Sequence, residues 1–488
     1  MGVLSGLEPH KVFGFFEEIC GIPHGSGNVK EISDYLVQFA KDRQLTWVQD
    51  ELNNVIIVKE ATKGYDQEPA IILQGHMDMV AVKKPKLDMD MKVEGLRLAV
   101  KGDLIYAQDT SLGGDDGIAV AYALALLDST NLAHPRLEVV ITVDEETGME
   151  GARGIDLSML KGRRMVNLDS EEEGIFLTSC AGGAAVHAYV PYGSREKEGL
   201  LYRISVEGFL GGHSGAEIHK ERGNSNCLMG RVLYKLTKEV PVCLESLQGG
   251  LADNAIPRQT TATVIISQDD QKKFEEIIAS VAKEIRTELA VKDPDVAIAV
   301  WPEEGSVCNH ICVDEESTAA LAAYLVALPN GVQAMSADVP GLVETSLNLG
   351  IMKLDRQEQE LVCDFSVRSC IASAKQSLVE KVCAVTELAG GCYSVTGDYP
   401  GWAYRADSPF REKMIRVYQR MYGKMPEIQA IHAGLECGIL ADKLDDLDCI
   451  SIGPDMKDIH TTEETLSISS TVRVWEYLVE LLAEKDFV

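Results

Sequence analysis

Five short segments of this sequence place carboxylate or imidazole side chains directly after a predicted strand or at a glycine-rich turn. They contain His76 and Asp78, Asp115, Glu145 and Glu146, Asp169, and His460. Side chains of these types bind divalent cations and take part in acid–base catalysis. Several carboxylates gathered at one edge of a sheet would repel one another unless a cation lies among them. The five segments together therefore predict a metal site.

Each segment taken alone also has an ordinary explanation. An Asp that opens a helix, such as Asp115, is most often a cap or a partner of the helix dipole. A single His after a strand is most often hydrogen-bonded or solvated, and the acidic run 171–173 is assigned no role. The metal prediction thus depends on the convergence of the five segments.

The combination of ligand types indicates which metals would bind. Two His, several carboxylates and no Cys favour zinc, cobalt or manganese over magnesium or calcium, and zinc is the commonest at N/O sites with open positions. More than four ligands suggests a pair of ions about 3.5–4 Å apart that shares one carboxylate and activates a water. A carboxylate that binds metal cannot also take a proton, so the neighbours Glu145 and Glu146 could divide the two tasks.

The elements that must position these residues follow an α/β pattern up to about residue 180. Segments 71–73, 137–143 and 164–168 are short, apolar and β-branched, as is typical of strands covered on both faces. An Ala/Leu-rich helix is predicted over 117–127. Open α/β sheets bind ligands beyond the carboxyl ends of their strands, where the acidic residues stand.

The pattern changes to hairpin-like strands and amphipathic helices over 184–396, and it returns to helix, strand and helix after residue 397. We therefore expect an α/β fold with a discontinuous catalytic domain of residues 1–183 and 397–488. This domain should hold a central mixed, mostly parallel sheet with helices on both faces. Residues 184–396 should form an inserted α+β domain.

Composition excludes several classes of partner. The chain has 488 residues, with 46 Lys and Arg against 76 Asp and Glu, a formal charge of −30 that disfavours nucleic acid and anionic membranes. No apolar run reaches the ~18 residues of a membrane span, and the first residues do not resemble a signal peptide. These features, with 12 scattered cysteines, predict a cytoplasmic protein. A homodimer is expected because symmetric dimers are the commonest soluble assembly.

A second possible metal site lies at Cys308, His310 and Cys312, which alternate at two-residue spacing and would share one face of a strand. Structural zinc sites of this kind usually need a second pair of ligands nearby. The sequence offers no such pair, so we do not expect zinc there.

Several motifs occur in an order that resembles a known family. They are HMD at 76–78, LGGDDG at 112–117, DEETGMEGA at 144–152, NLDSE at 167–171, GGHSG at 211–215, HAGLECG at 432–438 and IHTTEE at 459–464. The series resembles the co-catalytic zinc aminoacylase/carboxypeptidase superfamily of metallopeptidases. Within it, the sequence is most similar to the aminoacyl-histidine dipeptidase branch, also called cytosolic non-specific dipeptidase. The resemblance spans nearly the whole chain.

The resemblance implies a role for each residue of the predicted metal site. One ion would be held by His76, Asp115 and Asp169, and the other by Asp115, Glu146 and His460, with Asp115 as the bridge. Glu145 would be the general base, and Asp78 would orient His76. The peptide bond between Asp115 and Asp116 would be cis.

The resemblance also implies a zinc-peptidase-like catalytic domain whose inserted domain is a lid that carries substrate-binding residues. His213 would stabilise the oxyanion, although a polar turn residue would fit the same GGHSG context. Asn254 and Arg368 would bind the substrate carboxylate, and a structural salt bridge is the alternative for Arg368. His432 and Gly434, with Glu436, would line the substrate side.

These points predict a zinc-dependent dipeptidase that hydrolyses unblocked dipeptides, including Xaa-His, with a metal-activated water and Glu145 as base. The alternatives are an N-acyl amino acid deacylase or a tripeptidase with the same chemistry. A non-catalytic metal-binding protein is a third alternative, but such a protein has no use for an unliganded base beside the ligand Glu146.

Overall fold

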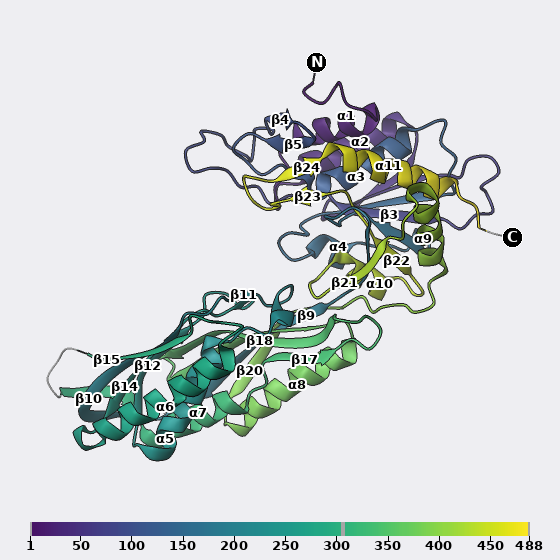
Figure 1. The fold of residues 1–488 in the computed structure, drawn as a ribbon. Coiled ribbons are helices and arrows are strands. Elements are labelled where there is room, and N and C mark those ends of the chain that lie inside the picture. Colours follow the sequence, from purple (N-terminus) through teal and green to yellow (C-terminus); the bar gives the residue numbers. More distant parts are fainter. Residues whose placement is uncertain (1, 304–307, 487–488) are drawn as a thin grey trace. The chain divides into compact units, whose positions relative to one another are not determined.

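The computed structural model describes residues 2–303 and 308–486, and the chain divides into two compact units (Figure 1). The first unit comprises Met1–Ser179, Trp402–Ala430 and Leu435–Val488, and the second comprises Cys180–Gly401 and Ile431–Gly434. Each unit has its own hydrophobic core.

The second unit differs at both ends from the predicted insertion 184–396. Strand β20 (Cys392–Tyr399) pairs with β9 (Gly182–Pro191) as far as Tyr399, beyond the predicted boundary. The Ala181 N–H donates to the carbonyl of Ile431 at 3.2 Å, in accord with the place of segment 431–434 in this unit. The sequence pattern missed these contacts because they join segments far apart in the chain.

The first unit is built on an eight-stranded sheet with parallel strands at its centre. Neighbouring strands run parallel along the order β6 (Leu137–Thr142), β3 (Ile71–His76), β7 (Arg164–Asn167) and β22 (Asp448–Ser451). Antiparallel pairings attach β1 (Thr46–Gln49), β2 (Val55–Lys59) and β8 (Ile175–Cys180), and β21 (Glu427–Ile431) completes the sheet. The predicted mixed sheet is confirmed, and β3 and β6 are buried along their whole length, as predicted.

Helices cover both faces of this sheet, as expected. In Figure 1, α1 (His10–Cys20), α3 (Gly114–Asp128) and α11 (Ile468–Ala483) lie above it, and α4 (Glu150–Gly154) and α10 (Glu436–Lys443) lie below it. The unit also contains α2 (Lys30–Asp42), α9 (Pro409–Tyr422) and a small sheet of β4 (Leu98–Lys101), β5 (Leu104–Ala107), β24 (Thr465–Ser467) and β23 (Met456–Lys457). No helix in the described part of the chain is long and apolar enough to span a membrane.

The strand register brings the ends of the central strands to one edge. His76 at the end of β3 pairs with Thr142 at the end of β6, and Gln74 pairs with Asn167 at the end of β7. The segments that follow these strands must therefore emerge together. This register explains why residues distant in the sequence converge on one site.

The second unit is an antiparallel sheet packed against helices. Its main path is β15 (Ala297–Pro302), β10 (Ser194–Glu207), β14 (Thr260–Ile266), β12 (Cys243–Gly249), β18 (Val343–Asp355), β19 (Glu360–Ser369), β9 and β20. Two further strands attach to this path, β16 (Cys308–Val313) on β10 and β17 (Gly331–Met335) on β18. Its helices, which cover one face in Figure 1, are α5 (Ser225–Glu239), α6 (Gln271–Leu289), α7 (Glu315–Ala327) and α8 (Ala372–Leu388).

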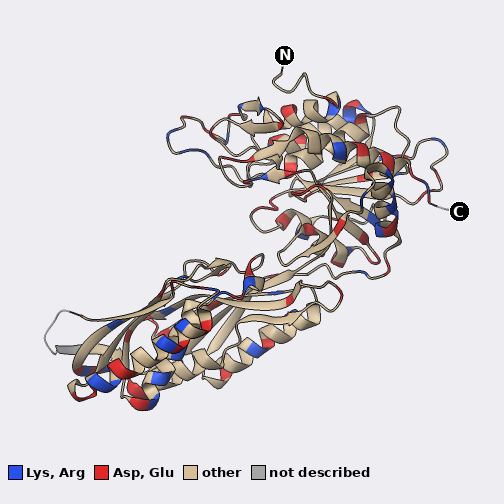
Figure 2. Ribbon diagram, viewed as in Figure 1, with Lys and Arg blue, Asp and Glu red and all other residues tan. Residues whose placement is uncertain are grey.

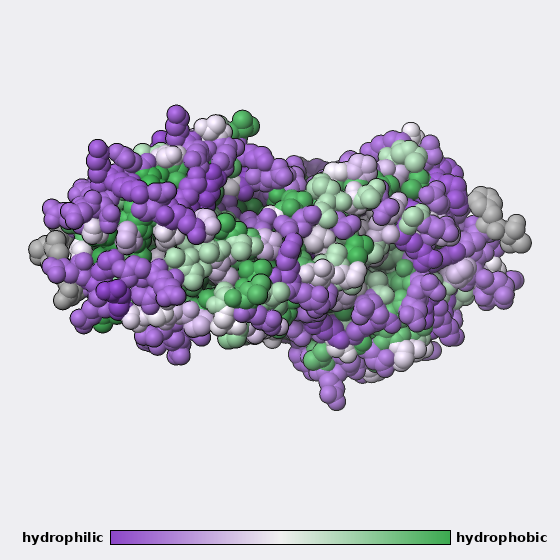
Figure 3. All heavy atoms as spheres, turned by 90° about the horizontal axis from the view of Figure 1, so that it is seen from below, coloured by the Kyte–Doolittle hydropathy of each residue, from purple (hydrophilic) through white to green (hydrophobic). Residues whose placement is uncertain are grey.

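The charged residues of both units include basic and acidic positions side by side (Figure 2). The face shown in Figure 3 is hydrophilic over much of its margin and also exposes groups of hydrophobic residues. The segment with Cys308, His310 and Cys312 forms the strand β16, but the Cys308 side chain lies outside the described residues.

Candidate functional site

The carboxylate of Asp115 lies between two imidazoles at the carboxyl edge of the first unit's sheet. Its Oδ1 is 3.1 Å from His76 Nε2, and its Oδ2 is 3.1 Å from His460 Nε2. Glu146 Oε1 lies 2.9 Å from the same His460 nitrogen. Asp115, Glu146 and His460 thus form a group that could hold a metal ion, and this is the set expected for one of the ions.

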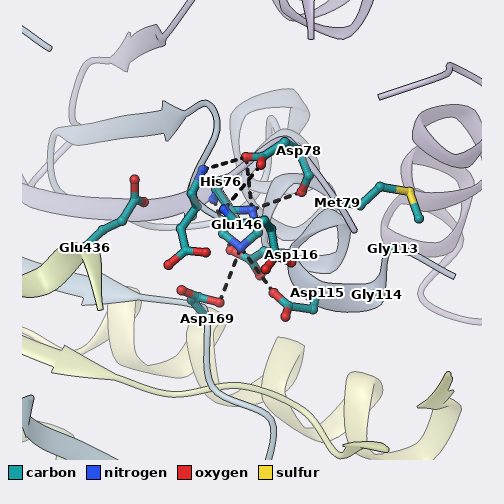
Figure 4. Close-up of polar contacts among 12 residues, drawn as sticks. His76, Asp78, Met79, Gly113, Gly114, Asp115, Asp116, Glu146, Asp169 and Glu436 are labelled. Atoms are coloured by element: carbon teal, nitrogen blue, oxygen red, sulfur yellow. Dashed lines mark hydrogen bonds and ion pairs between the residues drawn. The ribbon is translucent and has the colours of Figure 1, made fainter. Parts of the chain in front are cut away.

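A second group forms around His76 on the other side of Asp115. Asp169 Oδ1 lies 3.6 Å from His76 Nε2, so the three residues expected to hold the other ion are brought together (Figure 4). The ligand atoms of His76, Asp116 and Asp169 also lie within 4.8 Å of one another. Asp116 therefore belongs to the cluster as well, which the sequence analysis did not expect.

The loop that carries Asp115 and Asp116 has the backbone expected from the resemblance. The peptide bond between the two residues is cis, and neither has helical dihedral angles, so the regular part of α3 begins after them. The Asp116 Oδ2 accepts the backbone N–H of His76 at 3.2 Å. This contact requires glycine at position 75, because a Cβ there would lie 2.4 Å from Asp116 Oδ2.

Asp78 connects the strand that carries His76 to the segment that carries the two Glu residues. Its Oδ1 is 3.4 Å from His76 Nδ1 and accepts the Glu145 N–H at 3.1 Å. Its Oδ2 accepts hydrogen bonds from the Ser26 hydroxyl at 2.8 Å and the Glu146 N–H at 3.4 Å. Asp78 is 1% exposed, so this carboxylate is a buried support for the site. Such partners orient a ligating imidazole.

Burial and hydrogen bonds shift the pKa values of side chains in the cluster. Burial raises the pKa of Asp169 to about 6 and raises the pKa of Glu145 well above its usual range. Hydrogen bonds with Asp115 and Glu146 raise the pKa of His460 to about 10. Four of these groups are acids, and the raised pKa values show that the charged forms of Asp169 and Glu145 are destabilised here, an effect that a bound cation would reverse.

The donor set fits divalent cations. The groups that could hold an ion contain only imidazole nitrogens and carboxylate oxygens. Asp116 Oδ1 is buried and has no hydrogen-bond partner among the described residues, so this acceptor is left for a ligand. Zinc, cobalt and manganese all accept this set of donors.

Glu464 holds the loop of the bridging residue in place, and the sequence analysis did not identify it. Its Oε2 accepts the N–H groups of Leu112 at 2.8 Å and Gly113 at 3.2 Å, and its Oε1 accepts that of Gly114 at 2.8 Å. Glu464 is 3% exposed and stands four residues after His460. The carboxylate therefore connects the segments of two predicted ligands.

Glu436 is not where the sequence analysis expected it. It was expected to line the substrate side, but its side chain is completely buried. Its Oε2 accepts hydrogen bonds from Gln74 at 2.5 Å and Thr142 at 2.6 Å, and burial raises its pKa to about 7. Glu436 thus supports β3 and β6 from below the cluster, a role that its sequence neighbours His432 and Gly434 do not share.

The second unit contains a buried cation at Arg368. This residue is 8% exposed, forms no ion pair with a carboxylate in the described part of the chain, and has a buried Nε without a hydrogen-bond partner there. Its Nη1 donates to the Tyr399 hydroxyl at 3.2 Å. Burying a guanidinium without an anionic partner costs folding free energy. The surroundings of Arg368 therefore suit an anionic ligand better than a structural salt bridge.

His432 lies beside this guanidinium and is held neutral. Its Nε2 lies 2.7 Å from the Ser346 hydroxyl. Burial and the charge of Arg368 lower its pKa to about 3. Close packing explains why position 434 is a glycine, since a Cβ there would lie 2.9 Å from the Tyr399 ring. Tyr399 and Ser346 were not predicted, because no local sequence pattern marks a Tyr or Ser in a strand as a neighbour of such a site.

His213 and Asn254 line one cavity of about 740 Å³ in the second unit. The His213 Nδ1 accepts the backbone N–H groups of Gly215 at 3.2 Å and Ala216 at 3.0 Å. Burial lowers the pKa of His213, so the neutral ring must carry its proton on Nε2. The local turn therefore makes Nε2 a hydrogen-bond donor.

Comparison with known proteins gives matches over almost the whole chain. Residues 72–484 match peptidase family M20/M25/M40. The chain is 35% identical to the cytosol non-specific dipeptidase of Escherichia coli, with 99% of each chain covered. The crystal structure of aminoacylhistidine dipeptidase from Vibrio alginolyticus has a TM-score of 0.92 at 34% identity, again over 99% of each chain. The aminopeptidase PepT structure from Bacillus cereus shares the fold, with a TM-score of 0.57 at 16% identity and 98% of each chain covered.

Replacing Glu464 with Gln should weaken metal binding. The amide NH₂ group cannot accept the backbone N–H groups that the carboxylate accepts, so the loop of Asp115 would lose its fixed position. We expect the metal affinity to fall by about 10- to 100-fold. The measurement is the rise in unfolding temperature that Zn²⁺ causes in metal-free protein. Glu463→Gln is the matched control, because Glu463 is 68% exposed. An equal rise in both variants would contradict the role of Glu464.

Proposed function

The chain belongs to peptidase family M20/M25/M40, and on this basis we propose that it is a metal-dependent dipeptidase that hydrolyses the peptide bond of unblocked dipeptides, including Xaa-His. The observation that carries the proposal is the position of Asp115, whose two carboxylate oxygens face two different imidazoles. The names of the two relatives at 34% and 35% identity, both dipeptidases, support the substrate class.

Two divalent ions would be held by residues of the first unit. His76, Asp115 and Asp169 would hold one, and Asp115, Glu146 and His460 would hold the other. Zinc is proposed as the native metal because it is commonest at N/O sites of hydrolases, and cobalt or manganese would bind the same donors. Bound divalent ions polarise a carbonyl group and make water acidic near neutral pH.

Glu145 would move the proton during hydrolysis. Its carboxylate lies in the same group of ligand atoms as His76 and Glu146, yet it is not one of the expected ligands, so its lone pairs are available. It would take a proton from the attacking water and give it to the leaving amine. Asp78 would support this step, since it accepts the Glu145 N–H and fixes the backbone of the base.

The residues of the second unit would contact the substrate. The His213 Nε2–H would donate to the developing oxyanion, from the same chain or from a second copy. Arg368 would bind the substrate carboxylate with its fork of N–H groups, with Asn254 as a further donor. The neutral His432 and the close backbone at Gly434 would shape the wall beside Arg368.

The proposed location is the cytoplasm and the proposed assembly is a homodimer. The cytosolic relative supports the location, and the 12 scattered cysteines agree with it, because disulfides are rare in that compartment. The dimer rests on the general prevalence of twofold assemblies.

A substrate panel tests the reaction. We expect hydrolysis of free dipeptides, little hydrolysis of their N-acetylated forms and of tripeptides, and loss of all activity with a chelator. A deacylase would prefer the blocked forms, and a tripeptidase would prefer the longer ones. Activity that survives complete removal of metal would contradict a metallopeptidase.

Replacing Glu145 with Gln tests the base. The amide cannot accept a proton, so kcat should fall by about 100-fold or more. The metal content, measured by elemental analysis, should stay the same because Glu145 is not an expected ligand. Glu150→Gln changes an exposed acid of the same segment and serves as control. Near-normal turnover in Glu145→Gln would show that another group is the base.

Replacing Arg368 with Lys, and separately Tyr399 with Phe, tests the carboxylate site. Loss of a charge-assisted hydrogen bond costs about 1.5–3 kcal/mol, so Arg368→Lys should raise KM for a dipeptide by about tenfold or more. Tyr399→Phe should raise the KM less.

A dipeptide amide, which lacks the carboxylate, should show no further loss in either variant. Equal losses for acid and amide would contradict the assignment. Arg203→Lys, at a half-exposed position on β10, is the control.

A further inference from the structure

A cavity of about 540 Å³ opens in the first unit next to the metal cluster. Its size falls within the range of about 300–1,000 Å³ typical of small-molecule sites. Three of its lining residues are methionines: Met79 and Met89, which are 2% and 3% exposed, and Met91, which is half-buried. The proposed function gives this cavity no role.

Hydrogen bonds hold the outer wall of the cavity in place. The Asn28 side-chain amide donates to the carbonyl of Lys92 at 3.0 Å, and the Lys83 ammonium donates to the carbonyl of Met89. These bonds tie segment 89–92 to the loop after α1 and to the segment after β3. The two polar side chains are thus engaged with backbone, and the methionine wall is built into the fold.

The cavity is continuous with the metal cluster. Glu146, an expected ligand, lines it together with Thr147. Ser26, another lining residue, donates to the Asp78 carboxylate that supports His76. In Figure 4 the Met79 side chain points away from the carboxylates. A substrate group bound at the cluster would therefore lie beside the cavity, because Glu146 belongs to both.

The charged residues near the cavity indicate which end of a dipeptide would bind in it. An unblocked dipeptide carries a cationic amine on its first residue and a carboxylate on its second. Two acids, Glu146 and Asp90, and two lysines, Lys83 and Lys92, line the cavity, so the charges of its own lining are balanced. The neighbouring cluster adds several carboxylates, which attract the amine end of the dipeptide and repel its carboxylate end.

We propose that this cavity binds the side chain of the substrate's amino-terminal residue and that it selects apolar side chains of varied shape. The inference rests on the proposed dipeptidase function. Methionine is unbranched and polarisable, so a wall of three methionines adapts to ligands of different outline. The enzyme should then be broad in specificity yet prefer Leu, Met or Phe over Gly at the first position.

Met91→Trp tests the proposal by filling the cavity, and Met91→Ala tests it by enlarging the cavity. Two substrate series are compared by kcat/KM: X-Gly and Gly-X, with X as Gly, Ala, Leu or Phe. Met91→Trp should lower the preference for Leu-Gly over Gly-Gly by about tenfold. Met91→Ala should raise the preference for Phe-Gly over Leu-Gly. The ratios in the Gly-X series should not change. Met425→Trp, at a residue of the same unit that is 56% exposed, is the control.

A binding measurement separates this proposal from the chemistry. Calorimetry with the Glu145→Gln protein, which should bind substrate but turn it over more slowly by about 100-fold or more, should give a lower Kd for Leu-Gly than for Gly-Gly, and adding Met91→Trp should remove the difference. The proposal is overturned if Met91→Trp alters the Gly-X ratios instead, or if it alters neither series while dipeptides are hydrolysed. Failure of the wild type to hydrolyse any dipeptide would overturn the proposed function itself.

Discussion

The structure of the first unit depends on one electrostatic constraint, the burial of several carboxylates at a single edge of its sheet. Asp78, Asp115 and Asp116 are 9% exposed or less, and Asp169 and Glu146 lie against them. Buried carboxylates repel one another strongly because the protein interior screens charge poorly. The fold keeps them together with two imidazoles and a set of backbone N–H groups, and divalent cations would supply the remaining positive charge.

The supporting residues show how the constraint is met. Glu464 holds the loop of Asp115 through three backbone N–H groups, and Asp78 holds the segment of Glu145 and Glu146 through two. Gly75 leaves room for Asp116 beneath β3. The second unit contains one buried guanidinium, that of Arg368, which has no carboxylate partner among the described residues.

Much of the fold and of the candidate metal site could be predicted from the sequence, and the rest depends on contacts between residues far apart in the chain. Short apolar runs mark the buried strands, and most of the predicted ligands stand soon after such a run. His76, Asp115, Glu146, Asp169 and His460 could therefore be predicted to converge on one site. Glu464 and Tyr399 were missed because their partners lie more than 30 residues away in the chain. Glu436 was misplaced because His432 and Gly434, its close neighbours in sequence, belong to the other unit.

The central claim is that the carboxylate cluster is a site for two divalent cations. The most direct test is a calorimetric titration of the metal-free chain with Zn²⁺, combined with its thermal unfolding with and without the ion. We predict two equivalents bound per chain and a higher unfolding temperature in the presence of zinc, since a ligand that binds only the folded state stabilises it. Absence of binding, or an unfolding temperature that zinc leaves unchanged, would contradict the account.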